Sequence, residues 1–337
     1  MKRTKLAQQR VDSILGCLLG LASGDAMGMP TEFLTPEQIT EYYGEVNSFV
    51  QPHPKQIHAG MPAGRVTDDT GQALALANAA VAAGGRLTAA AVAEALLDWA
   101  DLLGPEYMHV AGPSTRRALA LLKRGFSLDQ AGWEGKTNGA AMRAPIAGLL
   151  HPGNLDAAVQ TAYDASLPTH GTNVAIAGSC AVACAVAQAL VPNSSLDSIM
   201  LAAMDGAARG ANRGRTVWGS SLKKRIQLAR RLVEQAENEK AAMQALYDYV
   251  GVDLLVSESV ATAFGVVQLA QGDPIKAILV SANLGGDTDT IGAISGAVCG
   301  TLKGARVFPP DWIETLERVN HLGLVLTSEK LSEVISD

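Results

Sequence analysis

Apolar residues recur at intervals of three or four positions along almost the whole chain, which is the spacing of one face of a helix. The stretches with this pattern are 11–19, 74–81, 92–99, 118–122, 176–190, 226–232, 260–269, 275–279, 291–302 and 312–319. Strict alternation of the strand kind is almost absent, and residues 46–50 are the only short candidate. The pattern predicts an all-α fold, a compact bundle of roughly a dozen helices of ordinary length.

Composition supports this prediction and favours one large core. Of the 337 residues, 48% are hydrophobic but only 4% are aromatic, so most of the apolar content is Ala, Leu, Val and Ile. Alanine loses no side-chain entropy in a helix, and small side chains let helices approach closely. Neither a break in composition nor a repeat of fixed period divides the chain. We therefore expect a polar N-terminal tail over residues 1–10 and a single domain over residues 11–337.

Charge and cysteine content limit the binding partners and the cellular compartment that we expect for this protein. A net charge of -6 provides no basic surface for nucleic acid, so an anionic substrate must be met by helix ends, single basic residues or metal ions. The four cysteines form no CxxC pair and lie in apolar sequence, which favours free thiols in a reducing compartment. The apolar stretch 174–191 contains Ser179, Gln188 and many alanines, so we interpret it as a buried helix and expect no membrane partner. With no secretory signal pattern after residues 1–10, we expect a cytoplasmic protein.

The segment 29–65 is the longest one without a helical pattern. It contains five prolines and several glycines. Connections of this length are uncommon inside compact domains and usually have a function of their own. We interpret this segment as a functional loop or lid.

Two clusters of carboxylates directly precede helical stretches. Residues 64–70 (GRVTDDT) contain Asp68 and Asp69, and residues 285–290 (GGDTDT) contain Asp287 and Asp289. One carboxylate at a helix start is most simply a cap, but two within three residues repel each other unless a cation compensates. Oxygen ligands without neighbouring His or Cys suit magnesium or calcium and not zinc. The two clusters would hold a pair of hard cations if the fold brings them together.

Three glycines follow the second cluster on one ridge of its predicted helix. They are Gly292, Gly296 and Gly300. Each is unfavourable in a helix by about 1 kcal/mol relative to alanine, so we interpret the ridge as a site of close packing against another helix. This interpretation places Asp287 and Asp289 deep in the bundle.

Further short motifs accompany the two clusters in a fixed order. They lie at residues 16–28 (GCLLGLASGDAMG), 112–119, 138–143, 169–170, 258–260 and 308–312. Taken together, they resemble the ADP-ribosylglycohydrolase family, which includes the glycohydrolase that reactivates dinitrogenase reductase and the animal ADP-ribosyl hydrolases. The likeness runs over about residues 14–317. One departure is Ala261, where relatives often have proline, and this residue is not a proposed ligand.

The resemblance implies a central site for two Mg²⁺ ions, with Mn²⁺ as an alternative. The implied ligands are Thr67, Asp68, Asp69, Asp287, Asp289 and Thr290. The mobile acidic residue of the family corresponds to Glu32, near the beginning of the long segment. Glycosidic cleavage passes through an oxocarbenium-like state that water attacks, and two cations would orient the ribose and polarise that water. Either Glu32 or Asp69 would take the proton, and the sequence leaves both open.

The substrate would contact a further set of residues. These are Gly112, Ser114, Thr115, Asn138, Gly139, Arg143 and His170. Asn138 is simply interpreted as a helix cap, and in the family context the free N–H groups of the same helix start would also bind a pyrophosphate. Arg143 is either a phosphate ligand or a structural ion-pair residue. A lone histidine such as His170 is usually structural, but the resemblance favours substrate contact.

The resemblance thus implies a hydrolase that releases ADP-ribose from protein arginine or another acceptor. An alternative substrate is a small N- or O-glycoside, such as a nucleoside or an ADP-ribosylated metabolite. A third interpretation is a non-enzymatic structural protein of the kind found among eye-lens crystallins. That interpretation predicts eroded ligands, whereas all six implied ligands and Glu32 are present.

Overall fold

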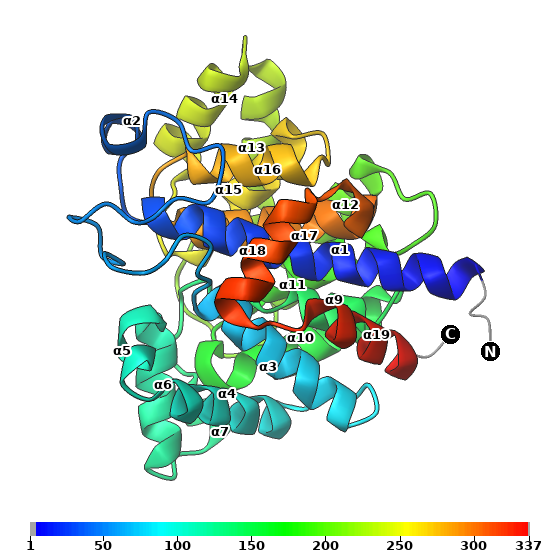
Figure 1. The fold of residues 1–337 in the computed structure, drawn as a ribbon. Coiled ribbons are helices and arrows are strands. Elements are labelled where there is room, and N and C mark those ends of the chain that lie inside the picture. The colour runs from blue at the N-terminus through cyan, green and yellow to red at the C-terminus, as the bar shows by residue number, and fades with distance from the viewer. Residues whose placement is uncertain (1–4, 336–337) are drawn as a thin grey trace.

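The computed structural model describes residues 5–335, and all regular secondary structure in this range is helical (Figure 1). The α-helices are α1 (Lys5–Gly28), α2 (Pro36–Tyr43), α3 (Asp68–Ala82), α4 (Ala89–Leu103), α5 (Tyr107–Val110), α6 (Pro113–Lys123), α7 (Leu128–Ala131), α8 (Gly139–Met142), α9 (Pro145–Leu149), α10 (Leu155–His170), α11 (Asn173–Ala189), α12 (Leu196–Gly210), α13 (Leu222–Gln235), α14 (Glu239–Ala245), α15 (Val256–Leu269), α16 (Pro274–Ala282), α17 (Thr288–Lys303), α18 (Pro310–Asn320) and α19 (Leu324–Val334). Three 3-10 turns, η1 (Met29–Thr31), η2 (Gly104–Glu106) and η4 (Ala305–Val307), and one π-helical turn, η3 (Leu246–Val250), lie between them. The prediction of an all-α fold is confirmed.

Helix α1 begins within the stretch that we expected to be a tail. Residues 5–10 are helical and continue directly into the rest of α1. Residues 1–4 lie outside the described part of the chain.

Helices α1 and α17 form the closest helix pair of the fold and run antiparallel. Glycines recur at every fourth position of α1 and face the glycine ridge of α17, in the pairs Gly16–Gly300, Gly20–Gly296 and Gly24–Gly292. A Cβ atom at any of these positions would collide with the backbone carbonyl group of the opposite helix. The interpretation of the α17 ridge as a packing surface is therefore confirmed, and its partner is the N-terminal helix.

Other helices surround this pair and bury it. Helix α11 is buried along almost its whole length and packs against α17 on one side and against α10 and α12 on the other. Helices α15 and α16 cover another face of α17, and α3 and α19 pack against α1. The stretch Gln8–Thr31 is long and apolar enough to cross a membrane, but 83% of its most apolar window is buried. It packs here as a core helix.

Residues 46–50, the one short candidate for a strand, do not form one. The side chain of Asn283 takes the place of a partner strand. It accepts a hydrogen bond from the backbone N–H of Val46 at 2.9 Å and donates one to the carbonyl oxygen of Val46 at 2.8 Å. A single amide thus satisfies the backbone groups that would otherwise begin a ladder.

The long segment 29–65 contains α2 and otherwise irregular backbone. Its first residues pair with the loop before α17, where Phe33 N–H donates to Gly286 O at 2.7 Å and Gly286 N–H donates to Leu34 O at 2.9 Å. Its end is tied to α18, because the Asn320 side chain donates to Gly64 O at 2.8 Å. The segment therefore begins against the loop that carries the second carboxylate cluster and ends just before the first cluster.

Candidate active site

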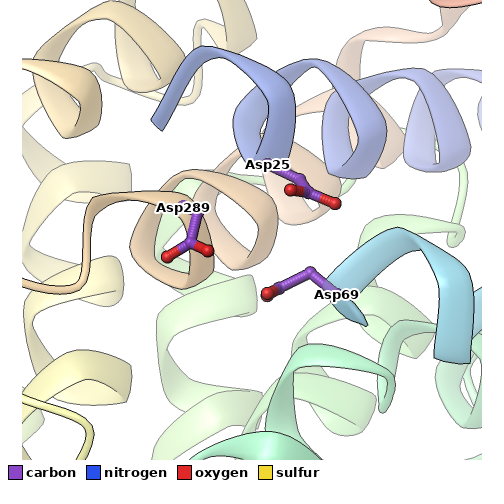
Figure 2. A group of neighbouring side chains, drawn as sticks. All are labelled: Asp25, Asp69 and Asp289. Carbon is purple, nitrogen blue, oxygen red and sulfur yellow. The ribbon is translucent and has the colours of Figure 1, made fainter. Parts of the chain in front are cut away.

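Three helix ends meet at one buried point. The last turn of α1 carries Asp25, the first turn of α3 carries Asp69 and the first turn of α17 carries Asp289, and Figure 2 shows the three carboxylates converging. Carboxylate oxygens of these residues lie within 4.8 Å of one another, and the same holds for Glu32, Asp287 and Asp289. The two acidic clusters, more than two hundred positions apart in the sequence, therefore share one site.

Asp25 anchors the start of α3, a role that was not predicted from the sequence. Its carboxylate accepts hydrogen bonds from the backbone N–H and hydroxyl groups of Thr67, at 2.9 to 3.0 Å. It also accepts from the N–H of Thr70 at 3.0 Å and from the Thr70 hydroxyl at 2.6 Å. Orphan N–H groups at a helix start need such acceptors, and here one side chain from another helix supplies them. Asp25 thus fixes α3 relative to α1.

The hydroxyl groups of Thr67 and Thr290 lie between the carboxylates of α3 and α17. The Thr67 hydroxyl lies 3.3 Å from Asp69 Oδ2 and 3.5 Å from Asp289 Oδ2, and the Thr290 hydroxyl lies 3.3 Å from Asp69 Oδ2. The other Asp69 oxygen, Oδ1, is buried and has no hydrogen-bond partner. A buried, unpartnered carboxylate oxygen is unfavourable unless something else binds it.

Asp287 is held by Asn138, which was expected to cap α8. The Asn138 amide donates hydrogen bonds to Asp287 Oδ2 and to Ser259 Oγ, the latter at 2.8 Å. Its side chain makes no capping bond to α8, so the capping interpretation is wrong. A charge-assisted bond to a buried carboxylate is stronger than a neutral cap, which explains why the amide turns to Asp287.

Burial and mutual repulsion disfavour the ionised forms of these acids. Loss of solvent raises the pKa of Asp25 from 3.8 to about 7 and the pKa of Asp68 from 3.8 to about 8, and repulsion by Asp289 adds to both shifts. The same two causes, in the same order, raise the pKa well above its usual range at Glu32, Asp69 and Asp287. Burial also raises the pKa of Asp289 itself.

The chemistry of this donor set fits hard cations. The ion pairs found within residues 5–335 bring no Lys or Arg to these six carboxylates, and only His58 pairs with one of them. Six buried acids must otherwise bind protons, at the expense of the charge that makes them ligands. The unpartnered Asp69 Oδ1 and the Thr67 and Thr290 hydroxyls add oxygen donors of the type that Mg²⁺ and Mn²⁺ prefer.

Glu32 enters the site from the long segment and pairs with His58. His58 Nε2 lies 2.5 Å from Glu32 Oε2, and both residues are almost fully buried. Burial raises the pKa of Glu32 and lowers the pKa of His58, so burial disfavours the charged form of both groups. The sequence offered no motif for His58, because it lies in irregular backbone with no neighbouring signature.

A cavity of about 320 Å³ opens onto the carboxylates. Of the predicted site residues, it is lined by Glu32, Asp68, Asp69, Gly112, Thr115, Asn138, Gly139, Asp287, Asp289 and Thr290. His58 and Arg116 line it as well, although neither was predicted. A larger hollow of about 750 Å³ lies between α2, α14 and α16, but none of the clustered carboxylates borders it. The smaller cavity is therefore the candidate active site.

Three predicted substrate contacts do not line the cavity. The Arg143 guanidinium is fully buried and donates to Gln72 Oε1 at 2.7 Å and to the Thr169 hydroxyl at 2.7 Å. His170 is also fully buried, and its Nε2 lies 2.9 Å from the hydroxyl of Thr137. The third, Ser114, accepts a hydrogen bond from the same hydroxyl at 2.9 Å. These side chains contact residues near the cavity wall, and Arg143 is bound by neutral acceptors, whereas one of its two interpretations was an ion pair.

Comparison with known proteins shows which family this chain resembles. The profile of the family described as ADP-ribosylglycohydrolase matches residues 6–336. The uncharacterized protein YegU of Escherichia coli (strain K12) is 36% identical over 317 residues, which cover 93% of this chain and 94% of YegU. The ADP-ribosylarginine hydrolase Tri1 of Pseudomonas putida (strain GB-1) is 27% identical over 352 residues, which cover 99% of this chain and 80% of Tri1.

A solved structure agrees with these sequence relatives. It is described as an ADP-ribosylglycohydrolase-related protein complex, and it matches this fold with a TM-score of 0.69 at 25% sequence identity. The match covers 96% of this chain and 99% of the other chain. Sequence and fold therefore agree over nearly the full length.

Proposed function

Because this chain belongs to the ADP-ribosylglycohydrolase family, we propose that it is a magnesium-dependent hydrolase that releases ADP-ribose from a modified protein. Arginine is the acceptor that we favour, because a relative that aligns with 99% of the chain is named an ADP-ribosylarginine hydrolase. An ADP-ribosylated small molecule is the other substrate that the same chemistry would accept.

One observation carries this proposal, namely a group of six buried carboxylates, five of which line the cavity, with no Lys or Arg paired to them among residues 5–335. Thr67, Asp68, Asp69, Asp287, Asp289 and Thr290 would hold two Mg²⁺ ions, or Mn²⁺ in their place. When bound, such ions supply Lewis acidity and lower the pKa of a coordinated water. The crystallin-like alternative has no support in this geometry, because the ligands are present and converge.

Of the two candidate bases, we favour Glu32 over Asp69. Asp69 lies close to the Thr67 and Thr290 hydroxyls and to Asp289, and this group of oxygen donors is typical of a metal ligand. Glu32 lines the cavity as Asp69 does, but its Oε2 is bonded to the neighbouring imidazole of His58. A base needs a position within hydrogen-bond reach of the water, and both residues have one on the cavity wall, so we base the choice on their different contacts.

The residues behind the cavity wall would keep the substrate site in shape. Thr137 lines the cavity and is held from behind by His170 and Ser114, while Gly139 lies directly against the His170 ring. A side chain at Gly139 would collide with that ring, so this part of the wall is backbone only. Backbone N–H groups at such a wall are suited to the oxygens of a pyrophosphate, which completes the proposed ADP-ribose site.

We also infer that the enzyme works in the cytoplasm. The four cysteines are all free and buried, and burial raises the pKa of each thiol. Buried protonated thiols are inert packing groups, and unpaired cysteines are typical of a reducing compartment.

The test is a comparison of substrates with one protein preparation. Purified protein with Mg²⁺ is incubated with an ADP-ribosylated arginine protein, with ADP-ribosylated small molecules and with a plain nucleoside, and free ADP-ribose or ribose is measured. Release of ADP-ribose from the arginine substrate, abolished by EDTA and restored by Mg²⁺ or Mn²⁺, is the expected result. Turnover of the nucleoside alone would favour the small-glycoside alternative, and full activity in EDTA would contradict the metal.

A further inference from the structure

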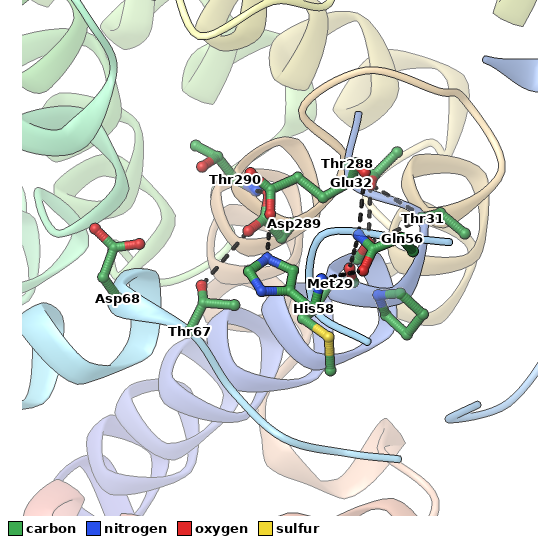
Figure 3. Close-up of polar contacts among 12 residues, drawn as sticks. Met29, Thr31, Glu32, Gln56, His58, Thr67, Asp68, Thr288, Asp289 and Thr290 are labelled. Atoms are coloured by element: carbon green, nitrogen blue, oxygen red, sulfur yellow. Dashed lines mark hydrogen bonds and ion pairs between the residues drawn. The ribbon is translucent and has the colours of Figure 1, made fainter. Parts of the chain in front are cut away.

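Glu32 is bonded to a second part of the long segment, residues 53–60, which contains none of the motifs described above. Two side chains of this stretch contact Glu32: Gln56 binds its backbone and His58 binds its side chain (Figure 3). We propose that residues 53–60 hold the Glu32 carboxylate in its working position and that His58 is the positioning residue. This inference rests on the proposed function, in which Glu32 accepts the proton of the attacking water.

Gln56 holds the backbone on both sides of Glu32. Its Nε2 donates hydrogen bonds to Met29 O and to Glu32 O, each at 3.1 Å, and only 4% of the residue is exposed. Its Oε1 accepts from the backbone N–H of His58 at 2.5 Å. One buried amide therefore uses both its donor and its acceptor to join the turn that carries Glu32 to the backbone that carries His58.

His58 binds the side chain of Glu32. Its imidazole is 4% exposed, borders the cavity and meets Glu32 Oε2 through Nε2 at 2.5 Å. The other carboxylates of the site receive hydrogen bonds from α-helix starts, hydroxyls or amides, whereas this one is bonded to a ring that faces the same cavity. A bond of this length leaves the carboxylate little freedom to rotate.

The backbone directly after Glu32 is fixed by the loop before α17. Phe33 has a φ of 59°, a left-handed conformation that is uncommon for a bulky residue, and it is kept there by its N–H bond to Gly286 O at 2.7 Å. The Phe33 ring is 45% exposed and lines the cavity beside Glu32. The left-handed conformation of Phe33 thus lets the consecutive side chains of Glu32 and Phe33 both face the cavity. In an extended backbone they would point to opposite sides.

A purely structural role for His58 would predict a different arrangement. A core histidine would fill space among apolar residues and would not border a cavity with a bond to a candidate base. The same stretch provides such a structural residue for comparison, because His53 stacks on Tyr42 at 3.9 Å between ring centroids and does not line the cavity. His53 is therefore a matched control of the same residue type on the same loop.

The kinetic test uses three variants, His58→Ala, His58→Gln and His53→Ala, assayed on the ADP-ribosylated substrate with Mg²⁺. His58→Ala should lower kcat by about tenfold or more and change KM by less than about twofold, because a misplaced base slows the chemical step and leaves binding intact. His58→Gln keeps a donor near the position of Nε2 and should recover most of the rate. His53→Ala should match the parent. Equal kcat in parent and His58→Ala, or a His58→Gln variant as slow as His58→Ala, overturns the proposal.

A second measurement does not depend on activity. Urea unfolding of His58→Ala, Glu32→Ala and the double variant in Mg²⁺ should show clear non-additivity, with His58→Ala lowering the midpoint in the parent and hardly at all in Glu32→Ala. Additive effects would mean that the two side chains do not act together, which overturns the proposal even if the enzyme is active. A parent protein without ADP-ribosyl hydrolase activity, in contrast, refutes the proposed function while the unfolding cycle still reports on the contact.

Discussion

Removal of divalent cations should make this protein less stable as the pH rises from 6.5 to 9. A carboxyl whose pKa is higher in the folded protein than in the unfolded chain binds its proton more tightly when folded. The stability that this proton contributes is complete below pH 3.8, the ordinary pKa of Asp, and is lost as the pH rises through the folded pKa, about 7 for Asp25 and about 8 for Asp68. A carboxyl with an ordinary pKa is already ionised in both states at pH 6.5 and contributes no such slope. The four buried thiols, whose pKa is also raised, lower the stability only near pH 9, so the fall between pH 6.5 and 7.5 is the part that reports on the carboxyls.

The magnitude follows from the two pKa values. Deprotonation between pH 6.5 and pH 9 removes about 1 kcal/mol of unfolding free energy through Asp25 and about 2 kcal/mol through Asp68. Glu32, Asp69 and Asp287 act in the same direction. The window begins at pH 6.5 because burial lowers the pKa of His58 and His170, and their opposite effect on stability is confined to more acidic solution. Together, Asp25 and Asp68 should lower the unfolding free energy by at least about 3 kcal/mol over this pH interval.

The assay is urea unfolding at 25 °C at pH 6.5, 7.5 and 9, with EDTA and with excess Mg²⁺. In EDTA the midpoint should fall as the pH rises, and the stabilisation by Mg²⁺ should grow, because the cation binds the ionised carboxylates. Asp68→Asn removes one of the titrating groups and should flatten the EDTA profile. A metal-free stability that is constant or rises over this interval would refute the argument that these carboxylates are buried together without a compensating charge.

The remaining predictions concern turnover, ligand binding and packing. Asp289→Asn should keep the fold, because Asn has the same shape and keeps the oxygen that accepts from the Thr290 N–H, but should lower kcat by orders of magnitude, as a rate assay beside a circular dichroism spectrum would show. Glu32→Gln should slow turnover while the dissociation constant of ADP-ribose, measured by calorimetry, changes little. ADP-ribose at a hundred times its dissociation constant should add about 2.7 kcal/mol of stability in Mg²⁺, seen as a raised melting temperature, and adenosine should add far less; equal shifts would favour a smaller glycoside. Gly20→Ala should lower the unfolding free energy by about 1–3 kcal/mol, because its Cβ would collide with the carbonyl of Gly296 in the opposite helix.

The parts of this site that were predictable from the sequence are those whose residues lie close together along the chain. Each acidic cluster precedes its helix within a few positions, so Asp69 and Asp289 could be assigned to the starts of α3 and α17. The glycine ridge of α17 was visible for the same reason. Helices α10, α12 and α19 were missed, because their apolar pattern is interrupted, for instance by Pro168 inside α10.

The unpredicted parts depend on contacts between distant segments. His58 is recognisable only through its bond to Glu32, and the sequence around it contains no motif. Asn138 had a good local role as a cap, but a buried carboxylate from another helix start binds its amide instead. Local rules describe what a residue does when nothing else approaches it, and both residues lie where several segments meet.

Asp25 shows how the packing and the chemistry of this protein depend on each other. An aspartate on an apolar helix gives no local sign of its partners, yet Gly24 beside it allows α1 to lie against Gly292 of α17. Because that backbone contact is so close, Asp25 and Asp289 come within one ligand shell of each other while Asp25 still reaches the N–H group of Thr67. Larger side chains on either ridge would separate the helices and with them the carboxylates. The glycines are therefore part of the site, since they set the distance at which these carboxylates could share a cation.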